Sequence, residues 1–280
     1  MLRADLDHCE WLPDDLKSGE MVFIPGGTFR MGSDHHYPEE APSHRVSVDG
    51  FWIDRTPVTN RQFKQFVNAT GHVTEAQIVP NAKDYPGAVK EMLYAGSLVF
   101  SPLPRITDLT DWSQRGGLEA EEFAWGDALM PGGKHMANIW QGNFPVQNHG
   151  EDGYERTSPV MAFPPNGYGL YDMIGNVWEW TSDWWSSRHA AEAAKPCCIP
   201  RNPRGGHEDA SYDPRLPDIK IPRKVLKGGS HLCAPNYCRR YRPAARHAEP
   251  VDTSTSHVGF RCVARLPLVI HHEPEGSSAT

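Results

Sequence analysis

Long apolar runs are what the sequence most plainly lacks. Its 280 residues contain no stretch close to the roughly 18 apolar residues that a membrane-spanning helix needs. The N-terminal residues 1–15 have no apolar core of the kind found in a secretory signal. The sequence therefore predicts a soluble, cytoplasmic protein with no membrane partner.

Positive charge is also scarce. Lys and Arg number 28 against 35 Asp and Glu, which gives a formal charge of -7 and argues against nucleic acid as a partner. Nucleotide-binding motifs, the zinc-protease HExxH motif and repeats of 20–50 residues are all missing. Ser230 follows two glycines but does not lie in a GxSxG elbow, so a serine hydrolase is a weak hypothesis.

Cysteine is sparse, whereas glycine, proline and tryptophan are plentiful. Six cysteines are too few for a disulfide scaffold, but 25 Gly, 25 Pro and nine Trp are typical of many turns fixed by aromatic anchors. We expect an α/β (α+β) fold: an irregular, loop-rich single domain with little regular secondary structure. The predicted divisions are a lead-in over 1–20, a domain over 21–266 and a disordered tail over 267–280.

Local patterns predict a few regular elements. Residues 21–32 fit a β-hairpin that turns at Pro25-Gly26-Gly27. Residues 44–53 alternate between apolar and polar, as in a half-buried strand. Apolar positions within 59–67 predict a helix, with Thr59 as its N-cap.

Three groups of polar residues could offer oxygen or nitrogen to a metal. His35, His36, Glu39 and Glu40 have no fixed ligand spacing, so we interpret them as a solvated loop. Asn138 with Asp152, and Asp172 with Glu179, carry the oxygen atoms that a hard cation such as calcium accepts. Residues of these types in loops are also frequent turn formers, and the pattern alone leaves both readings open.

The segment 227–262 holds the most unusual chemistry. Cys233 and Cys238 are separated by four residues, and five arginines follow before the segment ends at Cys262. A positive field favours the thiolate, which is the form that binds metal or reacts. Three readings compete: two buried apolar side chains, a zinc site for which too few ligands lie nearby, and a two-thiolate site for Cu(I) or for redox chemistry.

Four stretches carry a resemblance to a known family. They are IPGGTFRMGS, ANIWQGNFPVQNHGEDGY, PPNGYGLYDMIGNVWEWTSDWW, and the run from Lys227-Gly228-Gly229-Ser230 through the cysteine pair to Gly259-Phe260-Arg261-Cys262. In this order they resemble the formylglycine-generating enzymes, the sulfatase-modifying factor family. The resemblance covers roughly residues 20 to 266, and the two cysteines at this spacing are its most specific part. It implies a fold related to C-type lectins.

The resemblance implies a particular reaction. Such enzymes use O2 and Cu(I) to oxidise the cysteine of a Cys-x-Pro-x-Arg motif in an unfolded sulfatase polypeptide to Cα-formylglycine. We accordingly expect a monomeric oxidoreductase that takes this polypeptide and O2 as partners, with Cu(I) and structural Ca²⁺ as cofactors. Matched by position, the copper ligands are Cys233 and Cys238, and the residues beside the oxygen pocket are Ser230 and Trp178.

The same matching assigns further residues. Substrate contacts would come from Arg246, Tyr237 and His257. One calcium would be held by Asn138, Ile139, Asp152 and Tyr154, and another by Asp172, Gly175, Val177 and Glu179, with the apolar residues and Tyr154 acting through their carbonyls. Cys9, Cys197, Cys198 and Cys262 receive no role.

One departure from the family pattern bears on activity. Family members carry several dozen more residues at the position of 112–116, so this chain is expected to be shortened there, which raises the prospect of an inactive protein. Two other classes remain as alternatives. One is a non-catalytic, lectin-like ligand-binding module. The other is a non-haem iron sulfoxide synthase relative, which would need an additional histidine-rich domain.

Overall fold

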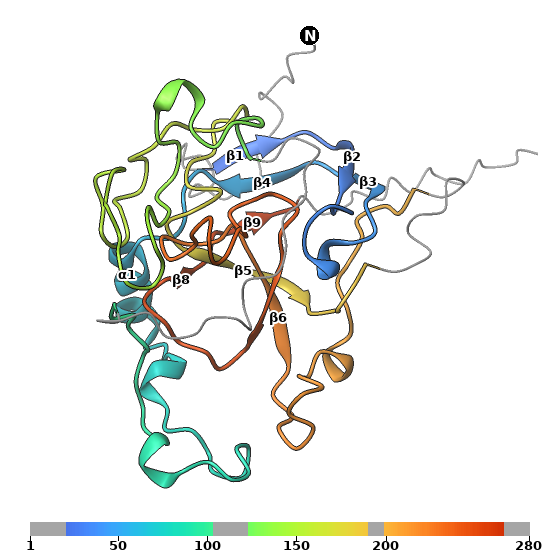
Figure 1. The fold of residues 1–280 in the computed structure, drawn as a ribbon. Helices are drawn as coiled ribbons and strands as arrows, with labels where there is room; N and C mark the ends of the chain where they lie inside the picture. Colours follow the sequence, from blue (N-terminus) through green and yellow to red (C-terminus); the bar gives the residue numbers. More distant parts are fainter. Residues whose placement is uncertain (1–20, 103–122, 190–198, 266–280) are drawn as a thin grey trace, which may run out of the picture.

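A computed structural model describes residues 21–102, 123–189 and 199–265. The expected lead-in and tail, the junction at 112–116, and the three cysteines Cys9, Cys197 and Cys198 lie outside the described residues. In the described part, strands and loops predominate, and the expected loop-rich α+β architecture is confirmed (Figure 1). No helix in these three ranges is both long and apolar enough to cross a membrane.

The N-terminal strands form one long, bent ribbon. β1 (Met21–Ile24) pairs antiparallel with β4 (Phe51–Asp54), and β2 (Gly27–Met31) pairs with β3 (His44–Val48). The predicted hairpin between the first two strands is therefore wrong, because β1 and β2 follow one another along the same side of the ribbon.

The glycines explain why the chain bends there and does not turn back. A Cβ on Gly26 would lie 2.9 Å from the backbone nitrogen of Gly50, so the two bends pack directly on each other. The register continues across the bend, from Ile24 opposite Phe51 to Gly27 opposite Val48. The strand predicted over 44–53 is accordingly interrupted at this point.

The predicted helix is confirmed as α1 (Asn60–Thr70). Thr59 accepts a hydrogen bond from the Gln62 backbone, and the Gln62 side chain accepts one from the Thr59 backbone, which satisfies two N–H groups at the helix start. Gly71 ends the helix in the left-handed conformation, with φ of 69°. The ring of Phe63 meets that of Phe260 edge-on, with centroids 6.2 Å apart, and so attaches the helix to the C-terminal segment.

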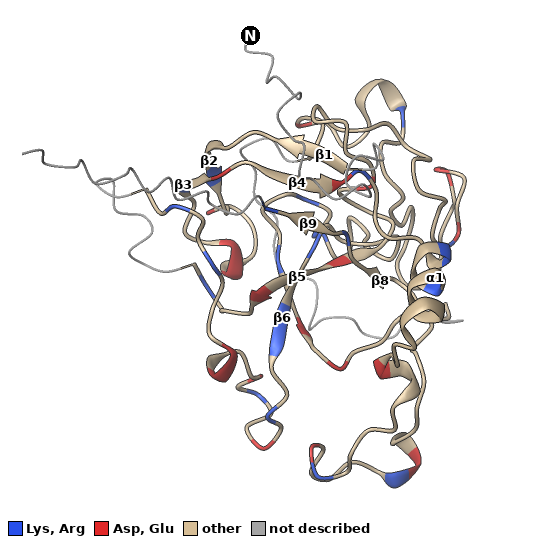
Figure 2. Ribbon diagram, turned by 180° about the vertical axis from the view of Figure 1, so that it is seen from behind, with Lys and Arg blue, Asp and Glu red and all other residues tan. Residues whose placement is uncertain are grey.

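A four-stranded sheet carries the centre of the domain. Its order is β7 (His247–Pro250), β6 (Arg223–Lys227), β5 (Trp178–Trp184) and β8 (Val258–Gly259), and only the β5–β8 pair is parallel. β9 (Val263–Ala264) returns to pair with β4. β6 is rich in basic residues and lies against acidic residues of β5 (Figure 2).

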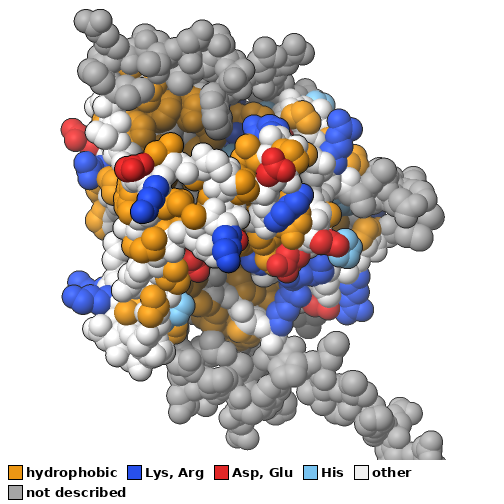
Figure 3. All heavy atoms as spheres, turned by 90° about the horizontal axis from the view of Figure 1, so that it is seen from below, with side chains coloured by type: hydrophobic (Ala, Val, Ile, Leu, Met, Phe, Trp, Pro, Cys, Tyr) orange, Lys and Arg blue, Asp and Glu red, His pale blue; other side chains and the backbone are white. Residues whose placement is uncertain are grey.

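Short 3-10 helices lie in the connecting loops: η3 (Pro38–Glu40), η4 (Glu75–Gln77), η5 (Lys90–Met92), η6 (Pro131–Gly133) and η8 (Glu208–Ala210). The main buried cluster joins loop residues from 123–139, 174 and 233–241 to strands β5 and β6, and it contains Phe123, Ala137, Ile139, Ile174, Trp178, Leu226, Cys233 and Tyr241. On the face shown in Figure 3, basic and acidic side chains are interspersed among apolar ones. The candidate site lies at the buried cluster.

Candidate active site

The backbone after β6 brings the two cysteines together. Gly228 and Gly229 have φ of 89° and 72°, and a Cβ on Gly229 would lie 2.9 Å from the Tyr241 backbone nitrogen. This close approach lets the following turn fold over the main cluster. The Cys238 backbone N–H then donates to the Ala234 carbonyl at 2.9 Å, and the Cys233 and Cys238 sulfur atoms lie 3.3 Å apart.

Two further predicted site residues lie beside this pair. Ser230 is completely buried, and its backbone N–H donates to the Cys233 sulfur at 3.4 Å. Trp178, at the start of β5, is 6% exposed and packs in the same cluster as Cys233, which is 2% exposed. Strand β5, the glycine turn and the cysteine loop thus bring together all four residues predicted to be catalytic, of which Cys238 is partly buried and the other three are buried.

The two thiols have opposite protonation tendencies. The hydrogen bond from Cys233 and the charge of Arg240, whose Nη1 lies 3.9 Å from the Cys238 sulfur, lower the pKa of Cys238 to about 6. Burial raises the pKa of Cys233 well above its ordinary value. The charge of Arg240 therefore favours the thiolate at both sulfur atoms, but at Cys233 the effect of burial is larger and the pKa rises.

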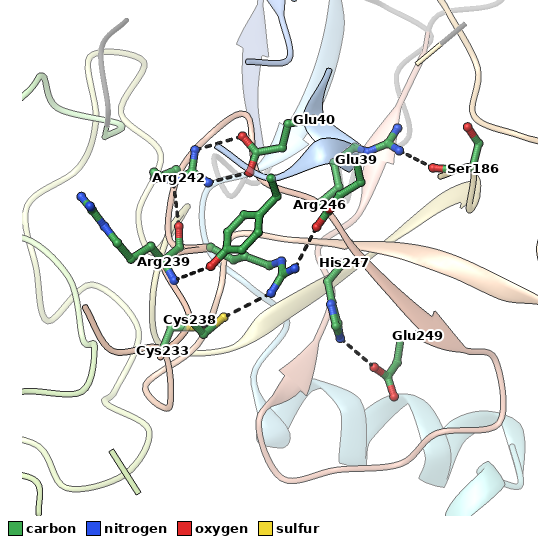
Figure 4. Close-up of polar contacts among 12 residues, drawn as sticks. Glu39, Glu40, Ser186, Cys233, Cys238, Arg239, Arg242, Arg246, His247 and Glu249 are labelled. Carbon is green, nitrogen blue, oxygen red and sulfur yellow. Dashed lines mark hydrogen bonds and ion pairs between the residues drawn. The ribbon is translucent and has the colours of Figure 1, made fainter. Parts of the chain in front are cut away.

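The predicted solvated loop is confirmed for His35, which is exposed, but is wrong for the two acidic residues, which face the arginines, Glu40 buried and Glu39 half-buried. Glu40 is fully buried and accepts two hydrogen bonds from Arg242, at 2.5 and 3.0 Å. Glu39 accepts from Arg240 at 2.8 Å. Figure 4 shows both carboxylates directed toward the arginine segment that follows Cys238. Sequence reasoning missed this contact because the partners are about 200 residues apart and only the charge of each segment is visible locally.

Of the three residues predicted to contact substrate, Tyr237 and His257 lie near the cysteine pair, whereas Arg246 lies against residues 186–189. Tyr237 stacks on Phe144 with centroids 4.1 Å apart, and burial raises its pKa to about 12. The carbonyl of His257 accepts from the Trp178 backbone at 2.9 Å, which ties this residue to the site. Arg246, however, is 8% exposed and contacts the Ser186 carbonyl and the His189 ring, so a role in substrate contact stays a prediction.

His247 lies beside the site, although its sequence pattern gave no signal. Its ring stacks on Trp178 with centroids 5.5 Å apart, and its Nε2 lies 3.6 Å from a Glu249 oxygen. Burial lowers the pKa of His247 to about 3, so the ring is neutral near pH 7 and forms no ion pair there. Its contribution is therefore an uncharged aromatic ring next to the tryptophan.

The first predicted calcium set comes together in the structure. The Tyr154 backbone N–H donates to the Asp152 carboxylate at 2.9 Å, and the Ile139 N–H donates to it at 3.3 Å. The Gln141 side-chain amide donates hydrogen bonds to both the Ile139 carbonyl and the Asp152 carboxylate. An N–H group therefore lies between two of the oxygen atoms expected to bind calcium. The Asn138 Oδ1 is buried and has no hydrogen-bond partner in the structure. These oxygen atoms are of the type that a hard cation accepts, and binding one between Ile139 and Asp152 would require the Gln141 amide to turn away.

The second predicted calcium set lies beside a positively charged side chain, that of Arg261. Both Glu179 oxygens accept from Arg261 at 2.6 Å, and the Asp172 carboxylate accepts from the Met161 backbone at 3.0 Å. Burial raises the pKa of Glu179 and that of Asp172. Because Arg261 already neutralises Glu179, the Asp172, Gly175, Val177 and Glu179 set fits calcium less well and stays a prediction. No group of three or more His, Cys, Asp and Glu side chains within the described ranges could hold a metal ion.

The lowered pKa of Cys238 predicts an unusual pH profile of alkylation. Because the thiolate is the reactive form, we expect the rate of Cys238 modification by iodoacetamide to be nearly constant above pH 7 and to fall as the pH drops through about 6. Mass spectrometry of the modified peptide gives this rate separately for each cysteine.

The control is Cys262, which is a free, exposed cysteine whose pKa is raised by partial burial. The rate of its modification should keep increasing into alkaline pH. In a Cys233→Ala variant the pKa of Cys238 should rise, because the hydrogen bond to its sulfur is lost. A Cys238 rate that keeps increasing through pH 8 and 9 in the unmodified protein would contradict the assignment.

This geometry defines a loop-rich α+β protein with a pair of adjacent free thiols at its buried cluster. Comparison with known proteins gives the family. Residues 12–266 match the model described as "Sulfatase-modifying factor enzyme 1-like domain". The chain is 41% identical to "Formylglycine-generating enzyme" of Mycobacterium tuberculosis, covering 88% of this chain and 97% of that protein. It is 38% identical to the mouse protein of the same name, over 90% and 77% of the two chains. The chain belongs to the sulfatase-modifying factor family, as the sequence resemblance indicated.

A third relative is named as inactive, and the mycobacterial relative is longer than this chain in the aligned region. The chain is 30% identical, over 87% of its length and 85% of the relative, to a mouse protein named "Inactive C-alpha-formylglycine-generating enzyme 2". Family membership is therefore compatible with a protein that has no activity. The alignment with the mycobacterial relative runs over 303 residues, more than the 280 of this chain, so that relative carries residues with no counterpart here.

Proposed function

We propose that this protein is an oxidase that converts the cysteine of a Cys-x-Pro-x-Arg motif in a sulfatase polypeptide to Cα-formylglycine, using O2 and a Cu(I) held by Cys233 and Cys238. The observation that carries the proposal is the pair of reduced sulfur atoms 3.3 Å apart in a buried, aromatic setting. Soft thiolate ligands in low number suit Cu(I). The relatives named formylglycine-generating enzyme support the substrate class.

The side chains of the site have distinct tasks in this proposal. Cys238 is ionised near neutral pH, whereas Cys233 must lose its proton before it can act as a second ligand. Copper, when bound, supplies the redox chemistry toward O2 that none of these side chains provides. Trp178 and Ser230 exclude water beside the sulfur atoms, which protects a reactive centre from side reactions.

A peptide assay tests the proposed function. Purified protein loaded with Cu(I) is incubated in air with a peptide that contains Cys-x-Pro-x-Arg, and the products are followed by mass spectrometry. We expect the mass loss of thiol-to-aldehyde conversion, together with aldehyde reactivity toward a hydrazide. Copper-free protein, an anaerobic reaction and a peptide with serine in place of cysteine are the controls. Folded, copper-bound protein that leaves the peptide unchanged would refute the oxidase.

One alternative is supported by a specific observation. A non-catalytic, lectin-like binding module would account for a chain that lacks residues present in its mycobacterial relative. A relative named as inactive is also 30% identical to this chain. The cysteine pair opposes it, because ligand binding does not need two buried thiols with divergent pKa values. In the assay above, this alternative predicts binding of the peptide with no change in mass.

We also propose that calcium binds to Asn138, Ile139, Asp152 and Tyr154. The buried, unpartnered Asn138 oxygen supports this site. We expect calcium to raise the melting temperature relative to protein in chelator, since a ligand at a hundred times its Kd stabilises by about 2.7 kcal/mol. The Asp152→Ala variant should show no such difference. Equal melting temperatures in calcium and chelator for the unmodified protein would show that this loop needs no cation.

A further inference from the structure

Arg240 touches three groups that come from two distant parts of the chain. Its Nη1 lies 3.9 Å from the Cys238 sulfur, and its Nη2 donates to Glu39 at 2.8 Å. The centre of its guanidinium lies 3.9 Å above the ring of Tyr37. The Tyr37 hydroxyl in turn accepts from the Arg239 backbone N–H at 3.2 Å. The guanidinium is thus held on one edge by a carboxylate and on one face by an aromatic ring, while another edge points to sulfur.

The turn that supplies Tyr37 and Glu39 is itself firmly attached. Its last residue, Glu40, is fully buried and paired with Arg242. The Glu40 carbonyl accepts from the Ser33 backbone at 3.1 Å, and a Cβ on Gly32 would lie 2.3 Å from this carbonyl. Gly32 has φ of 82°, so the turn closes tightly in a way that a larger residue would not permit. A rigid support is therefore present behind Arg240.

We propose that Tyr37 and Glu39 clamp Arg240 against the Cys238 sulfur, and that Arg240 is a positioning residue for the copper thiolates. This rests on the proposed function. Two cysteine thiolates around one Cu(I) carry a net negative charge, and a substrate thiolate adds another. Buried negative charge is costly unless a fixed positive group lies next to it.

Arginine suits this position better than lysine would. The guanidinium is planar and presents several N–H groups in fixed directions, so it can bind Glu39 and reach Cys238 at once while stacking on Tyr37. An ammonium group could keep the charge but could not stack flat on the ring with the same two contacts. Groups that surround metal ligands in this way commonly change metal affinity by 10–100-fold when they are removed.

Competition for Cu(I) with a chelator of known affinity, under anaerobic conditions, tests the clamp without measuring catalysis. We expect Arg240→Gln to weaken Cu(I) binding by about 10–100-fold. Arg240→Lys should lose less, and Glu39→Gln should also weaken binding. The matched control is Arg201→Gln, an arginine with a 69% exposed side chain that pairs with Asp49 on the surface, which should bind like the unmodified protein.

Glu39→Gln separates positioning from simple charge. Removing this carboxylate makes the surroundings of the thiolates more positive, so a pure charge effect would strengthen Cu(I) binding. Loss of the clamp would weaken it. Melting temperatures show whether each variant is folded, and Arg240→Lys with Glu39→Gln carries the test if Arg240→Gln does not fold.

Each result has a defined meaning for both proposals. Unchanged affinity in the Arg240 variants, or tighter binding by Glu39→Gln, would overturn the clamp and leave the copper oxidase intact. An unmodified protein that binds no Cu(I) would overturn the copper site and the clamp together. Weaker binding in both Glu39→Gln and Arg240→Gln, with folding retained, is the result that the clamp requires.

Discussion

Replacement of Cys238 by serine is expected to abolish peptide conversion, with a loss on the order of 10³-fold or more. The hydroxyl of serine is a hard, protonated ligand, whereas Cu(I) prefers a soft thiolate. Cys233→Ser should have a loss of similar size, and the double variant should be no worse than either single one, because the two sulfur atoms act as a unit. The measurement is the rate of aldehyde formation at saturating copper.

Cys262→Ser is the matched control for these variants. Cys262 is also reduced, but it is exposed and lies on the short segment between β8 and β9, with its backbone N–H bonded to Asp54. Its loss should leave the rate unchanged. If Cys238→Ser retained more than a tenth of the rate while folded, the dithiol would not be the centre of the reaction.

Replacement of Glu40 by alanine is expected to lower the free energy of unfolding by about 3–5 kcal/mol. Glu40 and Arg242 have side-chain exposures of 0% and 2%, so removal of one partner leaves a buried, uncompensated charge. A loss of this size is a large part of the stability of an ordinary domain. Urea unfolding followed by tryptophan fluorescence gives the value.

Two further variants test the physical reason. The double variant Glu40→Met with Arg242→Leu should recover much of the loss, because replacing both charges by apolar groups of similar volume removes the unpaired charge. Arg215→Ala breaks an ion pair in which the arginine side chain is 83% exposed, and it should change stability little. A Glu40→Ala protein as stable as Arg215→Ala would show that the buried pair is not needed for folding.

The sequence alone indicated the family and the cysteine pair at the centre of the candidate site. The spacing of Cys233 and Cys238, with the flanking glycine and arginine motifs, indicated the family that the comparisons later established. Local rules also sufficed for α1, because Thr59 and Gln62 form their capping contacts within four residues. The high glycine, proline and tryptophan content similarly predicted a loop-rich fold, since turn formation is a property of short segments.

Contacts between distant segments were decided only by the tertiary structure. The first two strands pair with residues 44–54 and not with each other. Gly26 and Gly50 lie opposite one another, so both arms of the ribbon can bend at the same point. Glu39 and Glu40 looked like solvent-exposed charges, but Glu39 is half-buried against Arg240 and Glu40 is fully buried against Arg242. A sequence pattern records the charge of each segment but not which segment lies opposite. In this loop-rich domain, pairing with the distant Glu39 holds Arg240 beside the Cys238 sulfur, a contact that the local sequence does not reveal.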